Sequence, residues 1–330
     1  MANKDLYRDC PNILKDFLFY IHTIKGRSER TVEAYYIDLK SFLRFLNLKN
    51  GLVNADTPFE EIKISNITIE NLKSISLSDV YEYLHFLSVE KDNSSITRSR
   101  KVSSIRSFFN YLTVKMHLLE VNPMKELEVP SIKKSLPKYL TLDQCIDLLK
   151  NIDGEYKERD YCIITMFLNC GMRLSELVGL NLSDISDNTI RLLGKGNKER
   201  IVYLNDACIS ALNQYIPIRN KQTIHQTSQN ALFISRNGQR ISKRRVQEIV
   251  ELNLKKAGLS NHGLSTHKLR HTAATIMYQY GDVDIKVLQE ILGHVNLGTT
   301  EIYTHISSKQ LEQAAKSTPL SKITNTKKKQ

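Results

Sequence analysis

Six residues in the second half of the chain carry side chains that together could transfer a phosphoryl group without a metal ion. They are two arginines, a lysine, two histidines and a tyrosine: Arg173, Arg270, Lys195, His267, His294 and Tyr303. Attack on a phosphodiester puts growing negative charge on its nonbridging oxygens, and guanidinium groups can bind both oxygens through paired hydrogen bonds. In such a reaction two arginines would do what magnesium does in many phosphoryl-transfer enzymes.

The lysine and the tyrosine suit the proton transfer and the nucleophilic attack of this reaction. Lys195 lies in a glycine-rich turn, Gly194-Lys-Gly-Asn-Lys198, from which a mobile ammonium group can protonate the departing 5′ oxygen. A phenol, with a pKa of about 10 in water, leaves more readily than a serine alkoxide, so a covalent bond to Tyr303 would be reversible. A lone arginine or histidine at a helix end is usually a surface or capping residue, so the prediction depends on the whole set.

The elements that must position these residues are almost all helices. Apolar residues recur at three- and four-residue spacing along most of the chain, and glycines such as Gly26, Gly171 and Gly293 follow these segments as helix stops. The predicted helices cover 13–24, 28–46, 80–87, 102–112, a stretch from about 142, 159–169, 242–257, 267–280, 284–292 and 298–306.

One β-hairpin interrupts the helices. Its predicted strands, Thr189–Leu193 and Arg200–Leu204, flank the turn that holds Lys195. Three prolines between Val121 and Pro137, with no sustained apolar period, predict a linker over 121–137. The expected fold is therefore mainly α in two domains, the second being mixed α/β with a small antiparallel sheet. Residues 47–78 break the helical pattern with short polar stretches.

Length and composition exclude several protein classes. The chain has 330 residues, of which 41% are hydrophobic and 25% charged, close to globular averages. No apolar run reaches the roughly 18 residues that span a bilayer, and the first residues lack the apolar core of a signal peptide. The five cysteines form no CxxC pair, which argues against a disulfide framework and a thiolate zinc site. We therefore expect a soluble cytoplasmic protein with no membrane partner.

The charge balance favours a polyanionic partner. The formal net charge is +12, from 47 basic and 35 acidic residues, whereas residues 1–120 carry 17 basic and 15 acidic side chains. The excess therefore lies in the second part of the chain, including a tail that ends Lys327-Lys-Lys329. Such a distribution suits a protein that works near phosphates, although plain solubility charge explains it as well.

Five short motifs follow one another through the second domain: Cys170-Gly-Met-Arg-Leu-Ser-Glu-Leu177, Gly194-Lys-Gly196, His267-Lys-Leu-Arg-His-Thr272, Leu292-Gly-His294 and Thr299-Thr-Glu-Ile-Tyr-Thr-His305. In order and spacing they resemble those of the tyrosine recombinases (the phage integrase family), especially its Xer-type members. The first domain is also similar to the helical core-binding domain of this family. The stretches that carry this similarity are Arg30-Thr-Val-Glu-Ala-Tyr35, Asp38-Leu39, Phe42, Ser103-Ser-Ile-Arg-Ser-Phe-Phe109 and Asn122-Pro123.

The resemblance implies a role for each candidate residue. Tyr303 would be the nucleophile that forms a 3′-phosphotyrosyl bond and frees a 5′ hydroxyl. Arg173 and Arg270 would clamp the scissile phosphate, and Lys195 would be the general acid. An acid/base partner, a hydrogen-bond donor to the phosphate and a support for the arginine pocket are also implied: His267, His294 and Glu176.

The same resemblance implies the assembly and its partner. Four protomers would join two DNA duplexes and exchange strands through a Holliday junction, as a homotetramer or as a heterotetramer with a related recombinase, with no cofactor and no metal. Residues 1–120 would be the core DNA-binding domain and 138–306 the catalytic domain. Residues 307–330 would form a C-terminal exchange helix, passed to a neighbouring protomer, and a basic tail.

Basic residues on the predicted helices of both domains suggest a clamp that holds double-stranded DNA. Each of them could equally belong to a solvated helix face, and only contacts to phosphate would make binding depend steeply on salt. The candidates are Arg98, Lys101, Arg106, Arg240, Lys243, Arg244 and Arg245.

Several alternatives stay open. The enzyme could resolve chromosome dimers or integrate and excise a mobile element, and residues 47–78 look longer than the corresponding turn of compact Xer proteins. A type IB topoisomerase shares the chemistry, and a non-catalytic DNA-binding protein shares the charge. His267 and His271 have the spacing of a zinc peptidase, but position 268 is lysine rather than the required glutamate.

Overall fold

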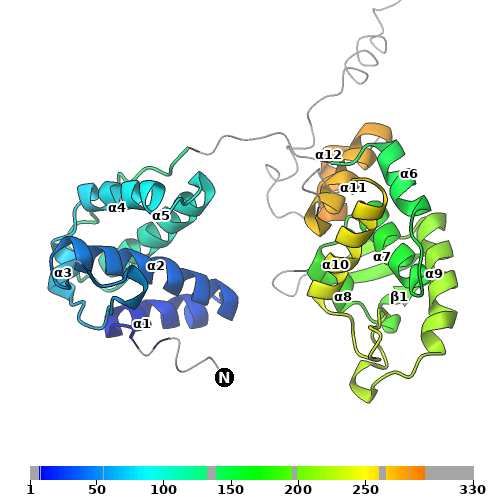
Figure 1. Ribbon diagram of the computed structural model, residues 1–330, viewed down its shortest axis with the longest axis horizontal. Helices are drawn as coiled ribbons and strands as arrows, with labels where there is room; N and C mark the ends of the chain where they lie inside the picture. The colour runs from blue at the N-terminus through cyan, green and yellow to red at the C-terminus, as the bar shows by residue number, and fades with distance from the viewer. Residues whose placement is uncertain are drawn as a thin grey trace, which may run out of the picture. The chain divides into compact units, whose positions relative to one another are not determined.

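The computed structural model describes residues 7, 9–54, 56–131, 139–194, 199–259, 265–281 and 283–293. The chain divides into two compact units, Met1–Lys134 and Ser135–Gln330. Figure 1 shows that helices dominate both units, which confirms the predicted fold class. In the described part of the chain, no helix has both the length and the apolar composition to cross a bilayer.

The first unit packs its helices around an aromatic core. Ser28 begins the longest helix as predicted, since its side chain accepts a hydrogen bond from the Thr31 amide. Phe17, Phe42 and Phe108 are almost completely buried in this core. The helices are α1 (Asn12–Phe19, continued by a π-helical turn, Tyr20–Ile24), α2 (Glu29–Lys49), α3 (Ile69–Lys73), α4 (Leu77–Val89) and α5 (Ser95–Asn110, continued by a π-helical turn, Tyr111–Lys115).

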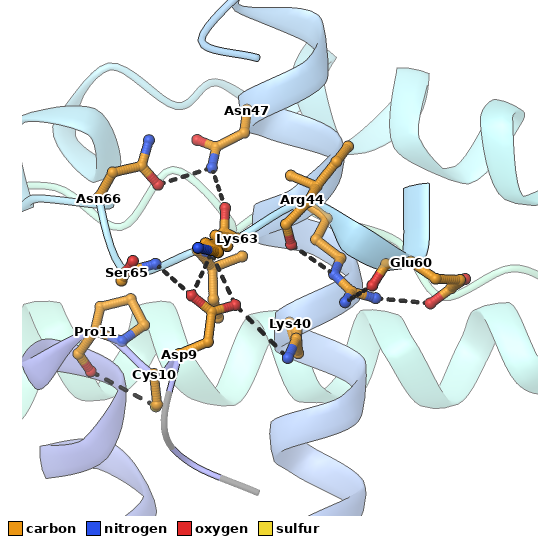
Figure 2. Close-up of polar contacts among 12 residues, drawn as sticks. Asp9, Cys10, Pro11, Lys40, Arg44, Asn47, Glu60, Lys63, Ser65 and Asn66 are labelled. Carbon is orange, nitrogen blue, oxygen red and sulfur yellow. Dashed lines mark hydrogen bonds and ion pairs between the residues drawn. The ribbon is translucent and has the colours of Figure 1, made fainter. Parts of the chain in front are cut away.

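The segment between α2 and α3 is packed on the first unit by hydrogen bonds and by buried isoleucines. Its backbone accepts hydrogen bonds from Arg44 Nε at Ile62 O (3.0 Å) and from Asn47 Nδ2 at Lys63 O (2.8 Å). On the other side, the Asp9 carboxylate accepts from the backbone amide of Ser65 at 3.1 Å (Figure 2). Isoleucines at 62, 64 and 67 are buried beneath these contacts. The region that interrupts the helical periodicity therefore contributes to the core.

The chain stays packed on the first unit beyond α5. Met124 and Leu127 are 1% and 2% exposed and belong to the same hydrophobic core. The first part of the predicted linker is thus attached to the first unit, because two apolar side chains among the prolines reach back to the helices. Residues 132–138 lie outside the described ranges.

The second unit surrounds a central helix with helices and a small sheet. Helix α7 packs against α6, α9, α10 and α11, and its Ile163, Met166 and Phe167 are completely buried (Figure 1). The helices are α6 (Leu142–Lys150), α7 (Lys157–Cys170), α8 (Leu174–Gly179), α9 (Asp206–Asn220), α10 (Lys243–Lys256), α11 (Thr266–Tyr280) and α12 (Ile285–Leu292).

The sheet contains the predicted hairpin and one further short strand. Strands β1 (Ile185–Ser186), β2 (Thr189–Leu193) and β3 (Glu199–Tyr203) are antiparallel in the order β1-β2-β3. Ile190 pairs with Val202 and both side chains face the core. The turn at 195–198 and the predicted helix at 298–306 lie outside the described ranges.

Candidate active site

A buried carboxylate, Glu176 on α8, lies at the centre of three guanidinium groups. Arg173 Nη1 donates to its Oε1 at 2.7 Å, and Arg200 Nη1 and Nη2 donate to Oε1 and Oε2, each at 2.8 Å. Arg270 Nη1 lies 3.9 Å from Oε2. Burial favours the protonated acid, but the hydrogen bonds and charges of Arg200 and Arg173 outweigh it and hold the pKa of Glu176 at about 2. One negative charge therefore faces three positive ones.

The same three arginines bind three consecutive backbone carbonyls at the end of α12. Arg200 Nε donates to Ile291 O at 2.9 Å, Arg270 Nη2 to Leu292 O at 2.5 Å, and Arg173 Nη2 to Gly293 O at 2.9 Å. Arg270 Nη1 also donates to Gly171 O, at the end of α7, at 2.6 Å. Carbonyls at a helix C-terminus have no partner within the helix and carry partial negative charge, so arginines suit this place.

Two glycines allow these helix ends to meet. Gly171 and Gly293 follow α7 and α12 with φ of +56° and +62°, a conformation that favours glycine. A Cβ on Gly171 would lie 2.8 Å from Leu292 Cδ2, and one on Gly293 would lie 3.2 Å from Arg200 Cδ. The two helix stops that the sequence predicts are therefore also places of close approach, Gly171 to the end of α12 and Gly293 to the Arg200 side chain.

The arginines differ in their access to a ligand. The Arg173 side chain is 35% exposed, whereas that of Arg270 is only 3% exposed. With Arg200 included, the cluster keeps an excess of positive charge over the single carboxylate at its centre. Such a preorganised cation suits an anionic group that develops further charge during a reaction.

His267 lies in the first turn of α11, on the same helix as Arg270. Its Nε2 is 3.0 Å from Nε2 of His271, and the two rings meet edge to face. Burial lowers the pKa of His267, and the positive charges of Arg270 and Arg173 lower it further. Burial and then His267 lower the pKa of His271 to about 4. Both rings are therefore neutral near pH 7, and a neutral His267 can accept a proton.

The structure brings together four of the residues predicted from the sequence: Arg173, Glu176, His267 and Arg270. Lys195, His294 and Tyr303 lie outside the described residues and stay predictions. Among the residues that are described, no group of three or more His, Cys, Asp or Glu side chains could hold a metal ion.

Sequence reasoning missed Arg200. A signal for it was present, because Arg200 and Val202 lie two residues apart on β3 and their side chains turn to the same, inner face of the sheet. An arginine on the buried face of a strand needs a partner, and here that partner is Glu176.

Two of the predicted DNA-binding residues are engaged within the protein. Lys101 is 7% exposed and its Nζ lies 3.5 Å from Asp38 Oδ1, so its ammonium group faces the core of the first unit. Arg240 donates to Val178 O at 2.9 Å and to Leu180 O at 2.7 Å. Both side chains are thus engaged with partners inside the protein, which argues against a role for either in contacting DNA.

The other predicted DNA-binding residues are more accessible. Arg98 is half-buried and donates to Ser88 Oγ and Asn93 O, each at 2.7 Å. The remaining four are exposed: Arg106, Lys243, Arg244 and Arg245. Three of these four lie in the first turn of α10, where the helix dipole disfavours positive charge. Their position there is compatible with an anionic partner.

Comparisons with known proteins cover nearly the whole chain. Residues 138–310 match the phage integrase family, and residues 13–116 match the N-terminal SAM-like domain of phage integrases. The tyrosine recombinase XerC of Caldanaerobacter subterraneus subsp. tengcongensis is 49% identical over 311 residues, which are 94% of this chain and 88% of that protein. The tyrosine recombinase XerD of Staphylococcus epidermidis is 32% identical over 305 residues, which are 91% of this chain and 96% of that protein.

Solved structures share the fold. The XerH site-specific recombinase bound to its difH substrate has a TM-score of 0.65 at 24% identity, covering 92% of this chain and 84% of that one. A lambda integrase dimer bound to a COC′ core site has a TM-score of 0.66 at 16% identity, covering 88% and 93%. With both domains matched and close relatives of nearly equal length, the chain belongs to the phage integrase family and is a tyrosine recombinase, an enzyme that breaks and rejoins DNA strands at specific sites.

Proposed function

We propose that the arginine cluster around Glu176 binds the scissile phosphate and that Tyr303 attacks it. The observation that carries this proposal is the pair Arg173 and Arg270, held side by side by Glu176 and by the carbonyl ends of α7 and α12. Fixed guanidinium groups need no rearrangement when charge develops on the phosphate, so their positions lower the activation barrier.

The proposed cleavage step exchanges one phosphodiester bond for another. The Tyr303 phenol oxygen bonds to phosphorus while the bond from phosphorus to the 5′ oxygen breaks. Neutral His267 accepts the phenol proton, and Lys195 donates a proton to the departing 5′ oxygen, which becomes a hydroxyl. His294 donates a hydrogen bond to the phosphate. Attack by a 5′ hydroxyl of another strand on the 3′-phosphotyrosyl bond reverses the step and completes strand exchange.

DNA is the partner that this chemistry requires, and solved relatives were captured with DNA recombination sites. We propose that four protomers join two duplexes through a Holliday junction, as a homotetramer or with a related recombinase, and that residues 307–330 contact a neighbouring protomer. The exposed basic residues at the start of α10 and Arg106 on α5 would contact backbone phosphates.

Relatives named XerC and XerD favour a role in chromosome-dimer resolution over mobile-element integration. The target site would distinguish the two roles. We expect DNA recovered as the covalent adduct from a digest of the host genome to map to one chromosomal site. Recovery of the ends of a mobile element instead would assign the second role.

The nucleophile is tested with a nicked duplex that carries the recovered site. On such a substrate the cleaved fragment diffuses away, so the covalent adduct accumulates and can be resolved on a denaturing gel. We expect wild type to form the adduct and Tyr303→Phe to form none, while its binding to the same duplex is unchanged. An adduct that persists in Tyr303→Phe would exclude Tyr303 as the nucleophile.

A further inference from the structure

Arg200 binds both Glu176 and the end of α12, and the proposed catalytic roles do not account for these contacts. It lies near the start of β3, its side chain is 13% exposed, and its guanidinium group joins three elements. Nη1 and Nη2 bind both oxygens of Glu176 on α8, each at 2.8 Å, while Nε binds Ile291 O at the end of α12 at 2.9 Å. Only a planar group with several fixed donors can make these contacts at once.

The backbone of α12 is shaped to this side chain. Gly293 follows α12 with φ of +62°, and a Cβ there would lie 3.1 Å from Nη1, 3.2 Å from Cδ and 3.3 Å from Cζ of Arg200. Arg200 therefore packs along the last residue before His294. It also follows the turn of Lys195 closely in sequence, so it links the strand after that turn to the end of α12.

The charge of Arg200 changes what the other arginines can do. Glu176 accepts two hydrogen bonds from Arg200, and it takes one from the side chain and one from the backbone of Arg173. Without Arg200, the carboxylate would be neutralised only by Arg173 and Arg270. Both guanidinium groups would then be drawn toward it, and they would have less positive charge left for a phosphate.

We infer that Arg200 is a positioning residue for DNA cleavage: it neutralises Glu176 and fixes the end of α12, so that Arg173 and Arg270 keep the positions in which they bind the scissile phosphate. This inference rests on the proposed function, in which those two arginines hold the phosphate. Arg200 itself need not touch the DNA, so its loss should slow the chemical step and leave binding intact.

Arg191 provides a matched control. It lies on β2 in the same sheet, but its side chain is 54% exposed and pairs with Asp184 and Glu199 at the surface. Arg191→Gln removes the same charge from the same hairpin without touching Glu176. Arg200→Lys keeps the charge of Arg200 but cannot bind both carboxylate oxygens and Ile291 O together.

The test measures single-turnover adduct formation on the nicked duplex at saturating enzyme, together with the Kd for the same DNA. We expect Arg200→Gln to slow adduct formation about 100-fold, with Kd within about threefold of wild type. Arg200→Lys should fall between the two, and Arg191→Gln should match wild type. A methylphosphonate at the scissile position carries less charge to stabilise, so the deficit of Arg200→Gln should shrink to about tenfold or less on that substrate.

Three results would overturn the inference. The first is a rate for folded Arg200→Gln within about threefold of wild type, and the second is a loss confined to Kd. The third is a wild-type rate for Arg200→Lys, which decides the matter even if the glutamine variant does not fold. If wild type itself forms no adduct, the proposed function fails and the inference fails with it. Adduct formation by wild type with an unaffected Arg200→Gln rejects the inference alone.

Discussion

Each unit of the protein contains a buried carboxylate surrounded by cations, but the two networks end in different places. Asp38 on α2 accepts hydrogen bonds from Arg100 at 2.5 Å and from Ser104 at 2.9 Å, and Lys101 lies 3.5 Å away. All three partners lie on α5, so this network joins two helices and ends there. Glu176 binds partners from three elements, whose other N–H groups continue to the ends of α7 and α12.

This difference distinguishes an ion pair that packs helices from one that prepares a site. In the first unit the ammonium group of Lys101 is buried beside Asp38, and burial lowers the pKa of Lys101. In the second unit three arginines share the carboxylate, and their remaining N–H groups donate to backbone carbonyls at the ends of two other helices. A buried ion pair is by itself weak evidence of stability. The acceptors that bind the remaining N–H groups of each guanidinium therefore say more about function than the ion pair does.

Replacing Arg270 should give the largest difference in cleavage rate between a substitution in the Glu176 network and one in the Asp38 network. We expect Arg270→Ala to slow adduct formation about 100- to 1000-fold, because the phosphate loses a fixed cation. The carbonyls of Gly171 and Leu292 also lose their donor, which should lower the free energy of unfolding by about 3 kcal/mol. Single-turnover kinetics and urea denaturation measure the two effects. Lys101→Met is the control, and an equal rate loss in it would contradict the comparison.

The pH dependence of stability should show that the ionised Glu176 carboxylate stabilises the fold. Its pKa is about 2 in the folded protein against an ordinary value of 4.5. Ionisation therefore stabilises the fold above pH 4.5 by about 3 kcal/mol, and this stabilisation is lost as the pH falls from 4.5 toward 2. The difference in unfolding free energy between wild type and Glu176→Gln should narrow over this range. A difference that stays constant would show that the carboxylate titrates normally.

Asp38→Asn should affect stability without affecting catalysis. The variant leaves the buried ammonium of Lys101 without a counterion, so we expect a loss of about 2 kcal/mol in the free energy of unfolding. The double variant with Lys101→Met should recover part of this loss, since no buried cation remains. At saturating DNA the rate of adduct formation should match wild type, and a tenfold drop would place Asp38 in the catalytic machinery.

Salt titrations give the smallest effect and separate buried cations from exposed ones. Each phosphate contact that is removed should reduce the slope of log Kd against log salt by about one. Arg244→Gln with Arg245→Gln should therefore reduce it by about two, although both side chains also pair with Glu248. Lys101→Met should leave the slope unchanged. A reduced slope in Lys101→Met would return that residue to the DNA-binding surface.

Local patterns in the sequence predicted much of this fold. The apolar period of α2, the stop at Gly171 and the two strands that flank residues 195–198 depend on neighbours in the chain, and these elements lie where the patterns indicated. Helices α3, α8 and α9 were missed, because α3 and α8 span only five and six residues and α9 contains Pro217. The buried isoleucines before α3 were missed because their partners, α2 and Asp9, are distant in sequence.

The candidate site was predictable only in part. The motifs around Arg173 and Arg270 indicated the two arginines, and the resemblance to a family supplied their roles. Lys101 is buried because it pairs with Asp38 on α2, and no sequence pattern within α5 indicates this pairing. Arg200 could have been recognised by its inward position on β3, but its pairing with Glu176 is a tertiary contact.

Three successive carbonyls at the end of α12 each accept a hydrogen bond from a different arginine. These contacts fix both the rotation and the axial position of the helix end. An insertion or deletion of one residue inside α12 would turn its end by about 100° and shift it by about 1.5 Å. Every carbonyl would then face the wrong side chain. We therefore expect substitutions on the exposed side of α12 to be tolerated better than a change in its length, which would disrupt all three contacts with the arginines.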